Sequence, residues 1–413
     1  MTTKQSPAGG DRRETILDAA EALILRDGID GIRAQSLADE AGISIATPYH
    51  YFESLDAIIT AAHARSSEQG AARRDAVVAA AGEDPVAQLR ALLIDDFVGT
   101  PTAVREAWLV RLEYQRRAIF DDALRANVRA GEQDALDRIA RIITAGQAAG
   151  SVPTEVPASN LAGRLLALSC GLGALLLVDV ITSEHASVLL SDAVDDRASW
   201  LSVAPEHAEP AALAAPAEPA HEDRATEILD QTIGLIAEAG VAGVHFRDVA
   251  LRAGTSLTLP RYYFPTIPRL VAAAFARDLE IAQARMGPTA DAVADPLERL
   301  AYTYMPKDAS ELAARRPTLV LWFEYLRLGE RDPDARSAAR ARLAAWINYS
   351  IALGQDLAQA GIIPGERVTR DRAERLVAVN TGASGLWLLG LLSDAEFAAV
   401  MNGVIDDEIG RRG

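Results

Sequence analysis

Residues 38–52, ADEAGISIATPYHYF, decide the fold of this chain. Helix-forming residues precede Gly42, a hydrophobic residue (Ile43) follows in the turn, and Ser44 is suited to begin the next helix. Aromatic residues close this second element at Tyr51 and Phe52. Two short helices separated by a glycine turn are the geometry of a helix-turn-helix, which we therefore predict here.

The same pattern recurs later in the chain. Residues 250–264 read ALRAGTSLTLPRYYF, and over 12–62 a shift of 212 gives 17 identities in 51 positions without a gap. At a shift of 211, LEYQR (112–116) aligns with FEYLR (323–327). These matches predict that the chain is a tandem repeat of two units of about 200 residues each.

Periodicity predicts an all-α protein. Ile16, Leu17, Ala20, Leu23 and Ile24 share one helical face, and no run of alternating β-branched residues predicts a strand. In the first copy we expect helices that end at Gly28 and Gly42, a third from Ser44 to about Phe52, a fourth that begins near Asp56 after a Ser54 cap, and others over 85–98, 103–118, 121–149, 159–182 and 184–200.

Five segments follow from the repeat. The stretch between the copies, APEHAEPAALAAPAEPAHED, has four prolines among Ala and Glu and is typical of an extended linker. We predict a helix-turn-helix head (11–62), a helical ligand-binding and dimerisation body (63–203), a linker (204–223), a second head (224–274) and a second body (275–413).

Composition restricts the function classes. The net charge of −17 argues against adhesion to nucleic acid through bulk charge, so any DNA contact must be local. The single cysteine, Cys170, excludes an internal disulfide and suits the reducing cytoplasm, where we expect the protein. The N-terminus lacks the apolar core of a secretion signal, and the apolar stretch 165–178 is too short to span a bilayer, so no membrane partner is expected.

Residues 12–62 resemble the N-terminal DNA-binding domain of TetR/AcrR-type transcriptional repressors. The shared elements are ILDAA, the glycine that closes helix 1, LA-x-x-AG-I-S and Y-H-Y-F-x-S, and the pattern returns more weakly at 224–274. The resemblance implies two such units in one chain, each with a helical ligand-binding and dimerisation body. Small residues in 169–174 and 382–390 would then form a four-helix interface, so that one chain acts as a pseudo-dimer, with further association possible. Cys170 is expected to be a small packing residue there.

In this family the third helix enters the major groove, and the N-terminus of the second lies near a phosphate. Carried over by position, the DNA-binding candidates of the first head are Arg33, Gln35, Ser44, Ile45, Ala46, Thr47, Tyr49, His50 and Tyr51. Those of the second head are His245, Arg247, Ser256, Leu257, Thr258, Arg261, Tyr262 and Tyr263. Packing against helix 1 is the alternative role for Tyr51 and Phe52.

The heads depart from the family in different ways. The family usually has lysine where this chain has Ile45 and Leu55, and Pro48 lies inside the expected recognition helix. Residues 11–59 contain four Arg and ten acidic residues (4 − 10 = −6), whereas 222–269 contain five Arg and six acidic residues (5 − 6 = −1). Two working heads would therefore read an asymmetric site.

The family body implies a small, largely apolar effector. The residues expected to contact this effector are Phe97, Trp108, Glu113, Tyr114, Tyr302, Tyr304, Trp322, Glu324, Tyr325 and Trp346. Core packing is the alternative for each aromatic residue, and the repeated glutamate can instead pair with Arg111 or Arg327.

We predict a transcriptional regulator, a repressor in the manner of the family, that binds double-stranded DNA and is released by its effector. No nucleotide-binding loop, hydrolase motif or metal-ligand spacing occurs, so we expect neither an enzyme nor a metal or cofactor. The alternative is an all-α ligand-binding or scaffold protein whose degenerate heads no longer bind DNA, as the acidic first head and the absent lysines suggest.

Overall fold

A computed structural model describes residues 9–195, 224–291, 293–306 and 309–409, and every regular element in these ranges is a helix. This confirms the all-α prediction. The predicted linker, 204–223, lies outside the described residues.

The first half of the chain begins with a head of four elements. Its elements are α1 (Gly9–Asp27), η1 (Ile29–Gly31), α2 (Ala34–Ala41) and η2 (Pro48–His50). The body that follows consists of α3 (Leu55–Ala80), α4 (Pro85–Ile94), η3 (Asp95–Phe97), α5 (Pro101–Ala118), α6 (Asp122–Ala148), α7 (Ala158–Leu177) and α8 (Ser183–Asp195). As expected, Ser54 caps α3 by accepting a hydrogen bond from Ala57 N.

The second half has a parallel order of helices. Its elements are α9 (Arg224–Ala239), η5 (Val241–Gly243), α10 (Phe246–Arg252), α11 (Thr258–Tyr263), α12 (Ile267–Asp291), α13 (Pro296–Tyr304), α14 (Ala309–Gly329), α15 (Pro333–Gln359), η6 (Gly365–Arg367), α16 (Arg370–Leu388) and α17 (Asp394–Ile409). Helices α10, α12, α13, α15, α16 and α17 begin 211 or 212 residues after α2, α3, α4, α6, α7 and α8.

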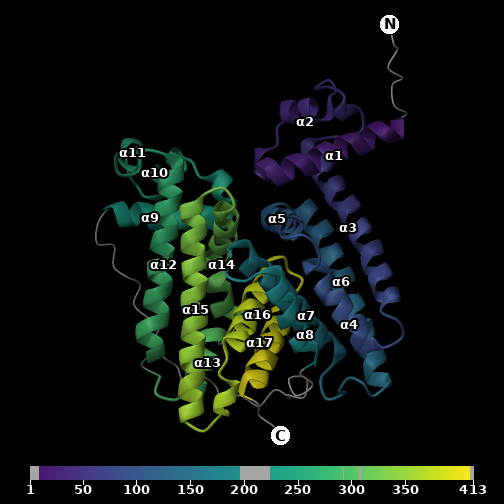
Figure 1. Ribbon diagram of the computed structural model, residues 1–413. Helices are drawn as coiled ribbons and strands as arrows, with labels where there is room; N and C mark the ends of the chain where they lie inside the picture. The colour runs from purple at the N-terminus through teal and green to yellow at the C-terminus, as the bar shows by residue number, and fades with distance from the viewer. Residues whose placement is uncertain (1–8, 196–223, 292, 307–308, 410–413) are drawn as a thin grey trace.

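The two bodies share one hydrophobic core. Figure 1 shows α12, α14 and α15 on one side, α3, α4 and α6 on the other, and α7, α8, α16 and α17 between them. Buried residues of both halves, such as Leu172 and Val377, belong to the same cluster. Smaller clusters lie under each head and reach into the body below it.

Helices α7 and α16 approach each other very closely. A Cβ on Gly171 would overlap the carbonyl oxygen of Ala378, and one on Gly382 would overlap that of Ala167. The two helices therefore need glycine at this crossing, because any side chain would push their backbones apart.

Helix α7 is long and apolar enough to cross a membrane, with a mean hydropathy of 1.6. However, 89% of that window is buried among the other helices, which makes it the central helix of the core. The helix predicted over 159–182 ends at Leu177, and Asp179 takes a left-handed φ of 58° just beyond it.

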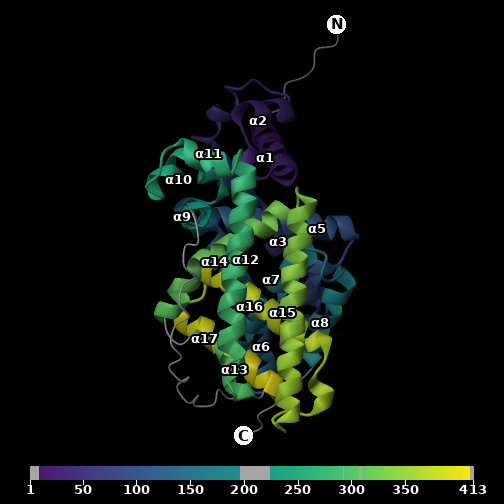
Figure 2. The ribbon, with the colours of Figure 1, turned by 90° about the vertical axis from the view of Figure 1, so that its left-hand side faces the viewer.

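Both heads lie at the same end of the molecule, away from the C-terminus. Helices α1 and α2 form one projection and α10 and α11 the other, and the view turned by 90° agrees (Figures 1 and 2). The elements that the sequence predicts to meet DNA thus lie on a common end.

Candidate nucleic-acid interface and ligand cavity

The first head has a helix-turn-helix outline with a very short third element. Helix α2 ends at Gly42, whose left-handed φ of 65° permits the turn. The α-helix predicted from Ser44 to Phe52 is wrong: in this stretch the structure has only the 3₁₀ helix Pro48–His50. Pro48 has no N–H to donate to Ser44, whose carbonyl oxygen instead accepts from Thr47 N at 2.9 Å.

Ser44 does not cap this element. Its hydroxyl pairs with that of Thr47 at 2.7 Å, and no side chain caps the 3₁₀ helix. Phe52 is buried beneath the turn, which is the packing role considered for it, whereas Tyr51 is 36% exposed. The other candidates of this turn lie at the surface or half-buried, namely Ile45, Ala46, Thr47, Tyr49 and His50.

Arg33 and Gln35 at the start of α2 are exposed but already engaged. Arg33 Nη1 donates to the carbonyl oxygens of Asp30 and Ile32, at 2.7 and 2.8 Å. Gln35 Nε2 donates to Asp39 Oδ1 at 2.7 Å. These contacts hold both side chains along the head surface, and a phosphate would compete with them.

The second head forms a true third helix, α11, although Pro260 stands where the first head has Pro48. Its proline lies in the first turn, where the missing N–H has no intrahelical partner to lose. Arg261 is exposed, with its guanidinium carbon 5.2 Å from the centre of the Phe246 ring. The remaining candidates of this head are also exposed, namely His245, Arg247, Ser256, Leu257, Thr258, Tyr262 and Tyr263.

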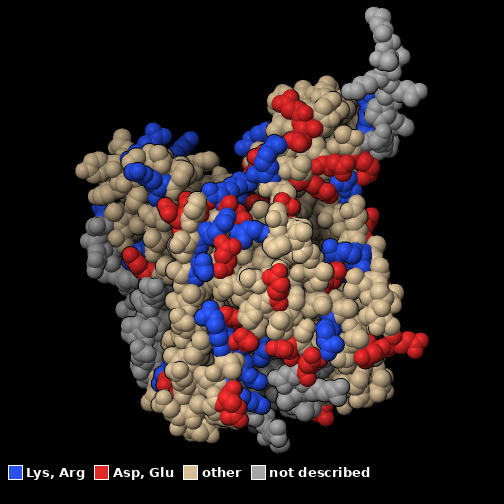
Figure 3. Space-filling model, viewed as in Figure 1, with Lys and Arg blue, Asp and Glu red and all other residues tan. Residues whose placement is uncertain are grey.

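Charge differs between the heads. Figure 3 shows basic side chains on the head formed by α10 and α11 and along the gap between the heads, and acidic ones on the outer part of the α1–α2 head. This matches the net charges of −1 and −6 counted from the sequence. The second head is thus the more favourable partner for a phosphate backbone.

Buried ion pairs cross between the two halves just below the heads. Arg327 Nε donates to Glu113 Oε1 at 2.9 Å, and Arg116 Nη1 donates to Glu324 Oε1 at 2.8 Å. Glu113 and Arg116 precede Glu324 and Arg327 by 211 residues, so each half contributes the same two residues to a reciprocal contact. None of these side chains is more than 14% exposed.

The carboxylates of Glu113 and Glu324 also bind the backbone of the heads. Glu113 Oε2 accepts from Ile29 N of η1 at 3.2 Å, and Glu324 Oε2 accepts from Val241 N of η5 at 3.3 Å. Each glutamate therefore joins the head of its own half to an arginine of the other half. Asp30 adds a contact to Arg116 at 2.6 Å in the first half, where the second half has Ala242.

A cavity of about 850 Å³ lies in the first body, between α1, α3, α5 and α6. Its apolar lining includes Leu92, Leu93, Ile139 and Leu166, and its polar lining includes Ser66, Ser67 and Tyr114. This volume is within the range that holds a drug-sized ligand. Because α1 also contributes Asp18 and Glu21, the cavity borders the head.

The predicted ligand-binding residues divide into two groups. Of those in the first body, Tyr114 lines this cavity, whereas Phe97 and Trp108 pack against each other in the adjoining core, with ring centroids 5.1 Å apart. Glu113 and Glu324 form the crossing ion pairs, which is the alternative role considered for them. Of the two partners considered, Arg327 pairs with Glu113, whereas Arg111 pairs with Glu132. The second-body aromatics are buried or half-buried, namely Tyr302, Tyr304, Trp322, Tyr325 and Trp346.

Cys170 lies beside Arg111, not in a reactive setting. Arg111 Nη2 lies 3.3 Å from the sulfur, yet burial raises the pKa of the thiol to about 12. A protonated, half-buried thiol of this kind is a packing group and a poor nucleophile.

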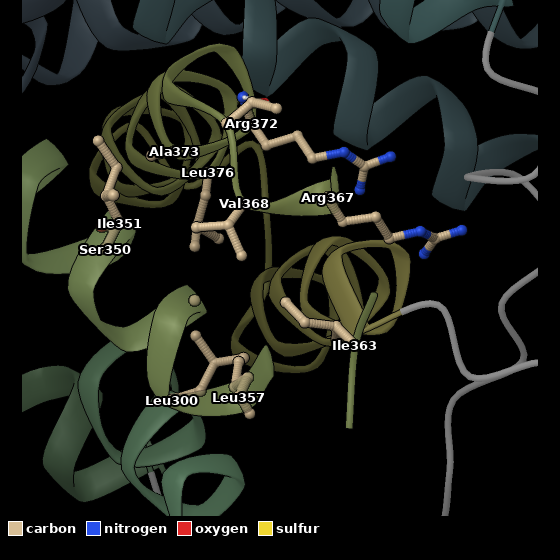
Figure 4. A pocket seen from close by; sticks show the side chains of 12 residues that line it. Leu300, Ser350, Ile351, Leu357, Ile363, Arg367, Val368, Arg372, Ala373 and Leu376 are labelled. Carbon is tan, nitrogen blue, oxygen red and sulfur yellow. Dashed lines mark hydrogen bonds between the residues drawn. The ribbon is translucent and has the colours of Figure 1, made fainter. Parts of the chain in front are cut away.

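A second, much smaller cavity of about 40 Å³ lies in the second body, between α13, α15 and α16 (Figure 4). Leu300, Leu357, Ile363 and Leu376 line it, with the guanidinium groups of Arg367 and Arg372 pointing away from its apolar centre. It has room for little more than a water molecule.

Sequence reasoning missed Arg116 as half of the crossing pairs. The signal was present, because the segments LEYQR and FEYLR both contain Glu-Tyr-x-Arg. Two such motifs in a duplicated chain can pair reciprocally, whereas either alone reads as an ordinary salt bridge within one helix.

Comparison with known proteins supports a regulator. Residues 16–62 match the family described as "Bacterial regulatory proteins, tetR family", a family of transcriptional regulators and not of enzymes. The chain is 28% identical over 151 residues to the HTH-type transcriptional repressor KstR of Mycobacterium tuberculosis, covering 36% of this chain and 64% of that repressor's length.

Solved structures give weaker similarities. A TetR transcription regulator from Haloarcula marismortui is 24% identical with a TM-score of 0.40. A protein from Saccharomonospora viridis, described as a transcriptional regulator and solved with choline, is 28% identical with a TM-score of 0.42. Each alignment covers 45% of this chain and 97% of the other.

Proposed function

We propose that this chain, a regulator with a TetR-family head over residues 16–62, binds double-stranded DNA and represses transcription until a small molecule releases it. The match of that head to the family carries the proposal, since the family's helix-turn-helix is a DNA-reading element. The exposed Arg261 and Arg247 on a second projection at the same end of the molecule support it.

The proposed unit of function is a single-chain pseudo-dimer. Three observations support this: the helix starts that recur at 211 or 212 residues, the close crossing of α7 and α16, and the reciprocal pairs of Glu113 and Glu324 with arginines of the other half. A two-fold repressor builds such an interface from two identical chains, and here one chain supplies both sides.

The proposed operator is asymmetric. The heads of a two-fold repressor reach half-sites about 34–36 Å apart, and identical heads read a palindrome. Here an arginine on the α11 head stands where the first head has Tyr49, so the two half-sites should differ in sequence. The second half-site would contribute more of the affinity, because a guanidinium can contact guanine with two hydrogen bonds.

A small-molecule effector would act through the 850 Å³ cavity. It is bounded by α1 of the head as well as by body helices, so a ligand that favours one spacing of these helices would also favour one position of the head. The effector then lowers DNA affinity by its differential affinity for the two states.

The test is a gel-shift titration of the purified chain with the DNA that flanks its own gene, at several salt concentrations. We expect a specific complex whose affinity falls steeply as salt rises, because phosphate contacts release counterions. A chain with no preference for that DNA over an unrelated fragment would instead favour the alternative, a ligand-binding protein with degenerate heads. The short 3₁₀ element and acidic surface of the first head are what favour that alternative.

A further inference from the structure

Several residues that line the cavity of the first body have larger counterparts in the second body. The repeat relates the lining residues Ser66, Leu93, Gly131 and Ala135 to Asp278, Tyr304, Arg342 and Trp346. At every one of these four positions the second body has the larger side chain. At these four positions the second body therefore leaves less room between its helices than the first.

Arg342 is held by contacts within the second body. Its Nη1 lies 3.5 Å from Oδ2 of Asp278, a carboxylate that is 3% exposed, and its guanidinium carbon lies 5.0 Å from the centre of the Trp322 ring. Thr318 Oγ1 donates to the other oxygen of Asp278 at 3.1 Å. In the first body the counterpart of Arg342 is Gly131, where a Cβ would already lie 3.1 Å from Ser67 Oγ.

Two aromatic residues complete the filling. Tyr304 is fully buried and stacks on Trp346 with ring centroids 5.8 Å apart, and its hydroxyl pairs with Ser350. Their counterparts in the first body, Leu93 and Ala135, remain on the wall of the cavity. A ligand in the second body would have to displace a paired ion and two stacked rings, which is costly.

The open cavity has a donor that no residue satisfies. Tyr114 is 2% exposed and lines the cavity, and its hydroxyl has no hydrogen-bond partner among the described residues. A buried hydroxyl without a partner is costly, so an oxygen acceptor on a ligand would stabilise it.

Three carboxylates on the cavity lining are paired with arginines of the protein. Asp18 and Glu21 both pair with Arg65 at 2.8 Å, and Arg111 pairs with Glu132. A charged ligand would have to break these pairs, whereas a neutral one leaves them intact.

We infer that each chain takes one effector, a neutral and largely apolar molecule with an oxygen acceptor for Tyr114, in the first body only. In the second body, the side chains of Arg342, Trp346 and Tyr304 take up the space that the effector would occupy in the first. The inference rests on the proposed ligand response but concerns the site itself. Only the first half of the pseudo-dimer would then bind effector, whereas a dimer of two identical chains starts with two equal sites.

The test uses Nile red, a neutral apolar dye with a carbonyl oxygen, whose fluorescence rises in apolar surroundings. Titration of the full chain should give one dye per chain. The variant Gly131→Arg/Ser66→Asp, which installs the charged pair of the second body in the first, should lose the dye. Ala130→Arg places the same side chain on the exposed face of α6 and should keep it.

The converse variant, Arg342→Gly/Asp278→Ser/Trp346→Ala, gives the second body the small residues of the first and should bind two dyes. Two dyes on the unchanged chain, none on it, or undiminished binding by Gly131→Arg/Ser66→Asp would each overturn the inference. If the triple variant does not fold, the dye stoichiometry of the unchanged chain and the dye binding of Gly131→Arg/Ser66→Asp still test the inference. Gel shifts without dye test DNA binding separately, so a chain that binds one dye but no DNA would refute the proposed function alone.

Discussion

Arg261 and Tyr49 stand at equivalent positions of the two heads and differ in what they can offer DNA. Arg261 lies on the helix α11, and its exposed guanidinium group lies over the Phe246 ring. Tyr49 is a 48% exposed phenol on a 3₁₀ turn. A guanidinium can meet a base edge with two hydrogen bonds, whereas a phenol offers one neutral contact.

We therefore expect Arg261→Ala to weaken DNA binding by about 1–3 kcal/mol and Tyr49→Ala to weaken it less. Titrations at one fixed salt concentration measure both, with Arg340→Ala on the exposed surface of α15 as the control. Equal losses from the two heads would contradict the proposed asymmetry.

The Cys170 thiol provides a residue-scale measure of core integrity. Because burial raises its pKa to about 12, the folded protein holds the proton and almost no thiolate exists at pH 8. Alkylation by iodoacetamide at pH 8 should be slow in the native protein and fast in denaturant. Native labelling at the unfolded rate would show that the α7 core opens freely.

The crossing ion pairs should matter far more than surface ones. Arg116→Met leaves the buried Glu324 and Asp30 without their guanidinium, which we expect to cost about 3–5 kcal/mol in the free energy of unfolding. Arg90→Met breaks an exposed pair with Asp195 and should cost only about 0–1 kcal/mol. Urea unfolding measures both, and similar small losses would mean that the network contributes little.

At the scale of elements, the contact between α7 and α16 holds the halves together. It depends on two glycines, Gly171 and Gly382, each facing a backbone carbonyl of the other helix. Helix pairs with side chains at such a crossing lie farther apart, and the ion pairs above them would then lose their geometry.

Gly382→Ala should therefore lower the free energy of unfolding by about 3 kcal/mol or more, since its methyl group meets rigid backbone. Gly365→Ala is the matched control, because nothing lies within 4 Å of the added methyl group. Thermal unfolding of the two variants distinguishes them. An unchanged melting temperature for Gly382→Ala would refute the close crossing.

At the scale of the whole molecule, the shared core makes each half incomplete. Leu172 of α7 and Val377 of α16 belong to one buried cluster that both halves build. Separation would expose these apolar helix faces to water, which costs roughly 25 cal/mol for each Å².

Expressed separately, residues 1–203 and 222–413 should aggregate or pair with themselves. Static light scattering across a concentration series measures this, with the full chain as the reference. Two well-behaved monomeric halves would show that each has a complete core of its own, and the single-chain interface would then be unnecessary.

The sequence alone determined the helical class and most helix boundaries of the first half, because periodicity, caps and glycine stops are local properties. Gly42 ended α2 and Ser54 began α3 as predicted. The prediction of a third α-helix in the first head was wrong. Helix preferences allow proline in a first turn, but they do not decide whether the helix continues beyond it.

Only the tertiary structure decided which side chains meet across the duplication. Glu113 and Arg327 lie 214 residues apart, and whether a buried glutamate faces a ligand or an arginine depends on how the two bodies dock. The difference between the bodies is of the same kind. Nothing in the local sequence distinguishes Gly131 or Arg342 from other helical residues. Only the packing of their helices puts Gly131 on the cavity wall and pairs Arg342 with the buried Asp278.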